Sequence, residues 1–259
     1  MLLVPMVIMP FLLSIGTTSP PRYFISSLSE SFASKSFKAA LSSDLPVPSS
    51  SRNLSVVYVP TAYAYVSVSS QSSPGRQRQR HRARSRKTAE SIRLALEDLG
   101  HTDPSVQELW LEDGKGEACL NDVDENVKED EKKVDLVLVD GGNTYHLYKS
   151  YAQSPVRARF LEALKECVFV GISAGAIIAG RKVSTAGIKG WDDEAEAGEV
   201  PWDWEEVEGM SLSSLSFLPH YEEKWEEAAG AWEAREGQEV VKIREEGAWR
   251  EQGGSGAFL

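Results

Sequence analysis

The chain contains a serine flanked by glycines and other small residues, a pattern that can expose the serine hydroxyl as a nucleophile. The pattern G-x-S-x-G occupies residues 171–175, with Ser173 at its centre, and it directly follows the apolar run 168–172. The run predicts a buried strand, and the small residues after the serine predict the start of a helix. A sharp strand-to-helix turn exposes the serine Oγ, and the first N–H groups of the helix point to the same place. We therefore predict that Ser173 is a nucleophile beside an oxyanion site.

A serine hydroxyl needs a base, and histidine is the usual one. The chain contains four histidines: His81, His101, His146 and His220. His220 follows the predicted strand 215–218 and so lies at a strand's carboxyl end, whereas His146 lies on the first turn of a predicted helix. Position therefore selects His220 as the base, with His146 as the second candidate.

The base in turn needs a carboxylate that orients it. No aspartate follows His220, so an acid later in the chain must be a glutamate, and Glu245 and Glu246 end the predicted strand 240–243. Three aspartates lie between the serine and the histidine: Asp192, Asp193 and Asp203. Spacing alone leaves the choice between these carboxylates open.

Predicted strands and helices alternate along the chain, which indicates a parallel sheet with helices on both faces. The predicted strands cover residues 22–27, 54–60, 106–111, 134–140, 168–172, 215–218 and 240–243. The predicted helices cover residues 31–41, 87–99, 145–151 and 156–165. Sites in such sheets lie beyond the carboxyl ends of the strands, where we place the loop 141–144 and the turn at Ser173.

The composition suits one globular domain. The chain has 259 residues, of which 41% are apolar, and a net charge of −11. Residues 1–100 carry a charge of +7 and the remainder carries −18. This acidic part argues against nucleic acid as a partner and disfavours strongly anionic substrates. Cys119 and Cys167 form neither a disulfide framework nor a zinc pattern, so we predict no metal site.

Two segments stand outside the predicted catalytic domain, which we assign to residues 22–259. Residues 1–21 form an apolar extension, in which 1–16 are similar to the apolar part of a signal peptide but lack a preceding positive charge. We expect a cytoplasmic protein with no membrane span, or a secreted or organellar one if residues 1–16 direct targeting. The basic residues 76–87 predict a solvated loop over 71–87.

Four motifs together resemble one family. Residues 139–147, 170–176, 217–221 and 245–249 are similar to the motif series of the aspartyl dipeptidase (dipeptidase E) and cyanophycinase family of serine peptidases. The resemblance covers about residues 22–250. It implies an α/β three-layer sandwich with a mostly parallel central sheet, similar to class I glutamine amidotransferases and flavodoxin-like.

The resemblance also implies roles for individual residues. By position, Ser173 matches the nucleophile, His220 the base and Glu246 the third member of a Ser-His-Glu triad. It further implies four residues of the oxyanion and substrate site: Gly142, Asn143, Thr144 and Ala174. Asp140 departs from the family pattern, because it stands where a third glycine is common.

We accordingly predict a serine-type peptidase that hydrolyses short peptides, as a dipeptidase or exopeptidase, through an acyl-enzyme. It needs no cofactor, and a homo-oligomer is compatible with this prediction. One alternative is an α/β-hydrolase-type esterase in which Asp192, Asp193 or Asp203 is the acid. A second alternative is a non-catalytic relative that keeps the fold and binds a partner.

Overall fold

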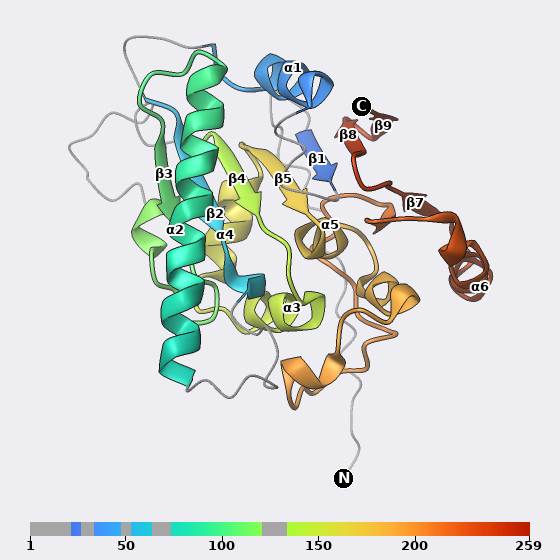
Figure 1. Cartoon of the computed structure of the whole chain (residues 1–259). Helices are drawn as coiled ribbons and strands as arrows, with labels where there is room; N and C mark the ends of the chain where they lie inside the picture. Colours follow the sequence, from blue (N-terminus) through green and yellow to red (C-terminus); the bar gives the residue numbers. More distant parts are fainter. Residues whose placement is uncertain (1–21, 27–33, 48–52, 64–73, 121–133) are drawn as a thin grey trace.

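The computed structural model describes residues 22–26, 34–47, 53–63, 74–120 and 134–259 (Figure 1). Side chains of the helix that begins at Pro74 are described from residue 79 onward. The predicted apolar extension 1–21 and the first residues of the predicted helix 31–41 lie outside the described residues.

A sheet of seven strands forms the centre of the fold, in the order β3-β2-β4-β5-β1-β8-β9. The first five strands of this order are parallel, whereas β8 is antiparallel to β1 and β9 is antiparallel to β8. The strands are β1 (Arg22–Ser26), β2 (Ser55–Val59), β3 (Ser105–Glu108), β4 (Leu136–Val139), β5 (Val168–Ile172), β8 (Ala248–Gln252) and β9 (Ser255–Phe258). All five residues of β5 are buried between its neighbours β4 and β1, as expected for an apolar strand covered on both faces.

Helices cover both faces of this sheet and produce the predicted three layers. An apolar cluster that includes Leu41 and Leu96 joins α1 (Lys35–Asp44) and α2 (Pro74–Asp98) to one face. Another cluster, which includes Phe160 and Ile178, covers the opposite face. Its helices are α3 (Thr144–Ala152), α4 (Arg157–Leu164) and α5 (Ala174–Ala179). The prediction of an α/β sandwich with a mostly parallel sheet is confirmed.

The basic segment was predicted wrongly as a loop over 71–87, because α2 begins at Pro74 and runs to Asp98 without interruption. Arginine, glutamine and lysine are good helix formers, and no glycine or proline interrupts the segment after Gly75. The run of basic residues without interleaved aromatics favours a solvated loop when it is read from the sequence alone. Among the side chains of this helix that are described, five basic ones are exposed: Arg80, Arg82, Arg84, Arg86 and Lys87.

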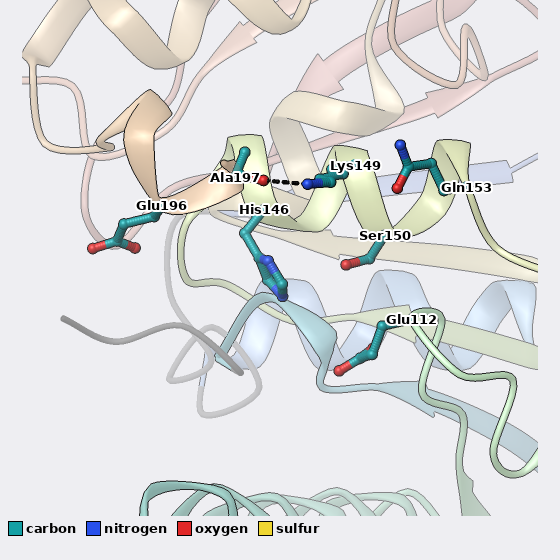
Figure 2. Close-up of a pocket in the computed structure, with 7 residues that line it drawn as sticks. All are labelled: Glu112, His146, Lys149, Ser150, Gln153, Glu196 and Ala197. Carbon is teal, nitrogen blue, oxygen red and sulfur yellow. Dashed lines mark hydrogen bonds between the residues drawn. The ribbon is translucent and has the colours of Figure 1, made fainter. Parts of the chain in front are cut away.

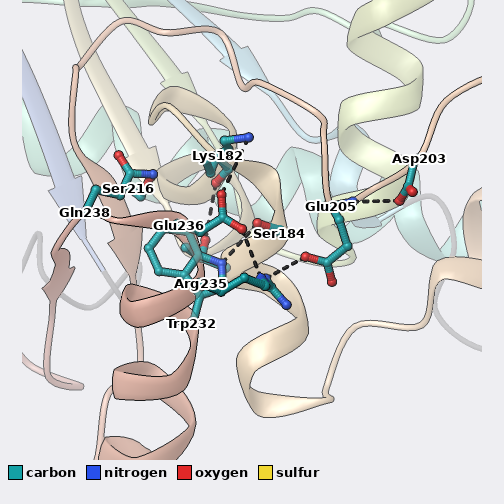
Figure 3. Close-up of polar contacts among 10 residues, drawn as sticks. Lys182, Ser184, Asp203, Glu205, Ser216, Trp232, Arg235, Glu236 and Gln238 are labelled. Atoms are coloured by element: carbon teal, nitrogen blue, oxygen red, sulfur yellow. Dashed lines mark hydrogen bonds and ion pairs between the residues drawn. The ribbon is translucent and has the colours of Figure 1, made fainter.

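A smaller parallel sheet, made of β6 (Ser216–Leu218) and β7 (Val240–Lys242), lies beside α6 (Glu226–Glu236). Polar contacts fix α6 to the 3₁₀ helix η5 (Val183–Lys189), as Figure 3 shows. The Trp232 indole donates to Ser184 Oγ at 3.0 Å, and the Lys182 ammonium lies 3.6 Å from Glu236. These contacts hold the segment that leads to residues 189–193.

The last two strands, which the sequence did not predict, form a hairpin through Gly253 and Gly254. Both glycines have positive φ, 59° and 80°, as a tight hairpin turn requires. In β8, Arg250 donates two hydrogen bonds to the buried Asp44 carboxylate of α1, at 2.9 and 2.6 Å. In the described part of the chain, no helix is long and apolar enough to cross a membrane.

Candidate active site

Ser173 occupies a strained turn between β5 and α5. Its φ and ψ are 51° and −107°, a conformation that residues with a side chain seldom adopt. Its N–H donates to Ser26 O at 2.8 Å, which ties the turn to the end of β1. A Cβ on Gly175 would lie 2.3 Å from Val139 O, so the second glycine of the pattern is needed for α5 to approach β4. The sequence pattern thus produces the predicted sharp turn.

His220 lies next to the serine hydroxyl, as predicted. It follows β6, has a φ of 55°, and places Nε2 2.8 Å from Ser173 Oγ. The side chain of His220 is only 13% exposed. This distance allows a direct proton transfer between the hydroxyl and the imidazole.

The carboxylate on the other side of the imidazole belongs to Glu245, whereas the family resemblance implies Glu246. Glu245 Oε2 lies 2.8 Å from His220 Nδ1, and the Glu245 side chain is 59% exposed. The Gly247 N–H donates to Arg244 O at 2.9 Å, so both glutamates occupy the central positions of one tight turn. Glu245 is the glutamate of this turn whose carboxylate bonds the imidazole.

The two loops that carry His220 and Glu245 are held together by the backbone. The Tyr221 N–H donates to Ile243 O at 2.9 Å, and the Ile243 N–H donates to Leu218 O at 3.0 Å. These bonds extend the pairing of β6 with β7 beyond the strand ends. The relative position of imidazole and carboxylate is therefore set by the small sheet.

The loop 140–143 passes directly beside the serine. A Cβ on Gly141 would lie 3.0 Å from Ser173 Cβ, and the Gly141 N–H is taken by Asp140 Oδ1 at 2.8 Å. Gly142 has a φ of +142°, and a Cβ there would lie 2.1 Å from Ala62 O. Within the described residues, the backbone N–H groups of Gly142 and Ala174 have no hydrogen-bond acceptor, so both can donate to a ligand.

Asp140, the departure from the family pattern, supports this loop from behind. It is 1% exposed and accepts hydrogen bonds from the Tyr58 hydroxyl and from the Gly141 N–H. A buried carboxylate is tolerated when hydrogen-bond donors surround it. Asp140 thus fixes the backbone of the loop from a buried position.

Asn143 and Thr144 hold the neighbouring segment in place. Asn143 caps α3 by accepting from the His146 N–H at 2.8 Å, and its amide donates to Asp193 O at 3.0 Å. The Thr144 N–H donates to Asp192 Oδ2 at 3.2 Å. Both residues therefore shape the site by connecting α3 to residues 192–193.

Two charged groups close to the imidazole have shifted pKa values. Burial lowers the pKa of Lys189 to about 8, against the opposing attraction of Asp192 and Glu245. Burial raises the pKa of Asp192 above its ordinary value, although the Thr144 bond and the charges of Lys189 and His220 oppose this shift. No sequence pattern indicates Lys189, because a single lysine in an acidic segment resembles a surface residue.

His146, the second candidate base, points into a different region (Figure 2). It lines a pocket of about 220 Å³ between α3 and η6 (Glu194–Ala197), together with Glu112, Lys149, Ser150, Gln153, Glu196 and Ala197. Burial, reinforced by the Lys149 charge, lowers the pKa of His146 to about 4, so its imidazole is neutral at pH 7. The histidine that contacts Ser173 is His220.

The aspartates of the esterase alternative have hydrogen-bond partners other than His220. Asp193 accepts from the Ala195 N–H at 2.9 Å, Asp203 accepts from the Glu205 N–H at 3.0 Å, and Asp192 bonds Thr144. Among the described residues, no group of three or more His, Cys, Asp and Glu could hold a metal ion.

The model of peptidase family S51 matches residues 27–257. The chain belongs to this family. The match confirms the resemblance to the aspartyl dipeptidase and cyanophycinase family and makes the chain a serine-type peptidase, a hydrolase that acts on peptides. The esterase and the non-catalytic relative are therefore not the preferred interpretations.

Solved structures agree with this S51 fold. A putative peptidase E protein from Listeria monocytogenes EGD-e is 19% identical, with a TM-score of 0.57, over 93% of this chain and 98% of that one. A peptidase from an acI-B1 actinobacterium is 15% identical, with a TM-score of 0.52, over 93% of this chain and 88% of that one. No curated protein sequence matches the chain.

Proposed function

We propose that this S51 peptidase hydrolyses dipeptides and other short peptides through an acyl-enzyme, with Ser173, His220 and Glu245 as its catalytic triad. The observation that carries the proposal is the continuous chain of contacts from Glu245 through the imidazole to the serine hydroxyl, each 2.8 Å long. The restriction to short peptides rests on the family resemblance. Glu245 replaces Glu246 in this proposal because it is the glutamate in contact with the imidazole.

The proposed reaction has two halves, acylation and deacylation, and His220 acts first as base and then as acid in each. His220 Nε2 accepts the Ser173 proton while Oγ attacks the peptide carbonyl, and the N–H groups of Gly142 and Ala174 stabilise the oxyanion. The imidazolium then gives its proton to the leaving amine, and the acyl-enzyme forms. In the second half His220 takes a proton from a water molecule that attacks the ester carbonyl. The C–Oγ bond then breaks, Oγ recovers the proton from His220, and the carboxylic acid product leaves. Glu245 accepts from Nδ1–H and keeps Nε2 facing the serine.

The test combines covalent labelling with hydrolysis. Wild type and Ser173→Ala are treated with a fluorophosphonate probe and assayed on a dipeptide library, with Ser91→Ala as control, because Ser91 is an exposed serine on α2. We expect labelling and hydrolysis in wild type and Ser91→Ala, and neither in Ser173→Ala. Equal labelling of Ser173→Ala would refute the assignment of the nucleophile. Labelling without dipeptide hydrolysis would refute the dipeptidase assignment alone.

A further inference from the structure

An exposed tryptophan lies beside the imidazole. Trp191, two residues after η5, is 56% exposed, and its ring centroid is 5.8 Å from that of His220. The Trp191 ring also contacts Trp225, with 6.1 Å between the two ring centroids and the ring planes nearly perpendicular. A tryptophan ring that faces solvent beside a reacting imidazole offers a large apolar surface to a bound substrate.

Lys189 places a positive charge against the same ring. Its ammonium lies 4.1 Å from the Trp191 ring centroid and donates to Pro219 O at 2.8 Å. Among the described residues, no carboxylate lies within ion-pair distance of this ammonium, and two of its three N–H donors remain for a ligand. Since its pKa of about 8 lies above neutral pH, the group is mostly charged at pH 7.

The segment that carries both residues is anchored, so their positions are defined before a substrate arrives. η5 ends at Lys189, and its first residues are bonded to α6 through Ser184 and Trp232 (Figure 3). At the other end, Asp192 accepts the Thr144 N–H. A binding group built on an anchored segment loses little conformational entropy when the ligand binds.

The chemistry of the proposed reaction determines which part of a peptide meets this surface. His220 Nε2 must reach the nitrogen of the leaving amine to protonate it. The residue that carries this nitrogen therefore lies on the imidazole side of the scissile bond, where Trp191 is located. In a dipeptide this residue also carries a free carboxylate, which the surrounding negative charges of Asp192 and Glu245 repel unless a cation receives it.

We propose that Lys189 and Trp191 form the subsite for the leaving residue, in which Trp191 packs against an apolar side chain and Lys189 binds the α-carboxylate. This inference rests on the proposed peptidase function. It assigns a substrate class, peptides whose residue after the scissile bond is apolar and carboxy-terminal. The exposed ring supplies contact area, and the ammonium supplies a charge-assisted hydrogen bond.

The first test measures selectivity for the leaving side chain. We compare the kcat/KM of wild type, Trp191→Ala and Trp191→Phe on a set of dipeptides. All of these dipeptides have the N-terminal residue that wild type prefers, and their second residue is glycine, leucine or phenylalanine. We expect Trp191→Ala to reduce the preference for leucine and phenylalanine over glycine about 10-fold, and Trp191→Phe to retain most of it. Phe258→Ala, which removes an aromatic ring that is 59% exposed on β9, is the control and should leave the preference unchanged.

The second test measures selectivity for the carboxylate. For Lys189→Met, we expect the ratio of kcat/KM for a dipeptide to that for its C-terminal amide to fall about 10- to 100-fold. The lysine also bonds Pro219 O, next to His220, so a loss of kcat shared equally by acid and amide would indicate a positioning role and would overturn the proposal for Lys189. An unchanged side-chain preference in Trp191→Ala would overturn it for Trp191.

The two proposals fail in different ways. Fluorophosphonate labelling of Ser173 does not require a leaving residue with a side chain or a carboxylate, so it reports on the nucleophile independently of the subsite. Absence of labelling and of hydrolysis in wild type would refute the proposed function and the subsite with it. Labelling and hydrolysis with no change in either selectivity ratio would refute the subsite alone.

Discussion

Glu245 and Glu246 are adjacent glutamates that offer a matched pair of substitutions. The proposed triad predicts that Glu245→Gln lowers kcat, because its amide group cannot stabilise the imidazolium that forms when His220 takes the Ser173 proton. The exposed fraction of Glu245, 59%, decides the magnitude. Two unit charges about 4 Å apart interact by ~1 kcal/mol in water and by ~4 kcal/mol at an effective dielectric constant of ~20.

Because more than half of this side chain faces solvent, the lower part of that range applies. A loss of about 1–2 kcal/mol corresponds to a decrease in kcat of about 5- to 30-fold. This decrease is far smaller than the ~10⁴-fold loss known for a buried triad aspartate replaced by asparagine. The decrease should also shrink at high salt, since exposed charges are screened.

The assay is steady-state hydrolysis of the best dipeptide from the library, at low and high salt, for wild type, Glu245→Gln and Glu246→Gln. We expect a lower kcat with little change in KM for Glu245→Gln and wild-type kinetics for Glu246→Gln. A loss confined to Glu246→Gln would refute the reasoning from the structure and restore the assignment that the family resemblance implies. Equal decreases in kcat in both variants would show that catalysis depends on the total negative charge of the turn and not on the Glu245–His220 contact.

Three further predictions concern stability. Gly142→Ala should lower the free energy of unfolding by ~1–3 kcal/mol or more, because the φ of Gly142 is +142° and the new Cβ would lie 2.1 Å from a carbonyl oxygen. Urea unfolding measures this loss, with Gly237→Ala as control. Gly237 has a φ of +65° and no atom within 4 Å of its added Cβ, so its variant shows the cost of backbone strain without a clash. Tyr58→Phe should cost about 1.5–3 kcal/mol in the same assay, because it removes a donor from the buried Asp140 carboxylate, and an unchanged midpoint would contradict the role given to Asp140. Burial raises the pKa of Asp192, so the folded protein keeps the Asp192 carboxyl protonated to higher pH than the unfolded chain does. The contribution of Asp192 to the free energy of unfolding therefore falls as pH rises above ~4. The Tm of Asp192→Asn minus the Tm of wild type should therefore increase from pH ~4 to neutral pH. A difference in Tm that does not change with pH would contradict this prediction.

Local patterns determined much of the fold and the centre of the site. The apolar run before Ser173 and the glycine after it predicted a buried strand and a sharp turn, because these features depend on residues that are neighbours in the chain. The buried strands of the parallel sheet were predicted for the same reason. The hairpin at Gly253 was missed because β8 and β9 are short and their residues are mostly partly buried or exposed. The basic helix was missed because its arginines form no apolar face.

The choice of the orienting carboxylate was decided by tertiary structure alone. Glu245 and Glu246 have the same chemistry and differ by one position, so only the direction in which each leaves its turn distinguishes them. That direction depends on the pairing of β6 with β7, which brings together segments that are far apart in the sequence. The same holds for Lys189 and Trp191, whose position beside His220 results from the packing of η5 against α6. The sequence by itself determined which groups can react, because reactivity belongs to residue types and to local backbone geometry. Which groups surround them depended on contacts between distant segments, and these exist only once the chain has folded.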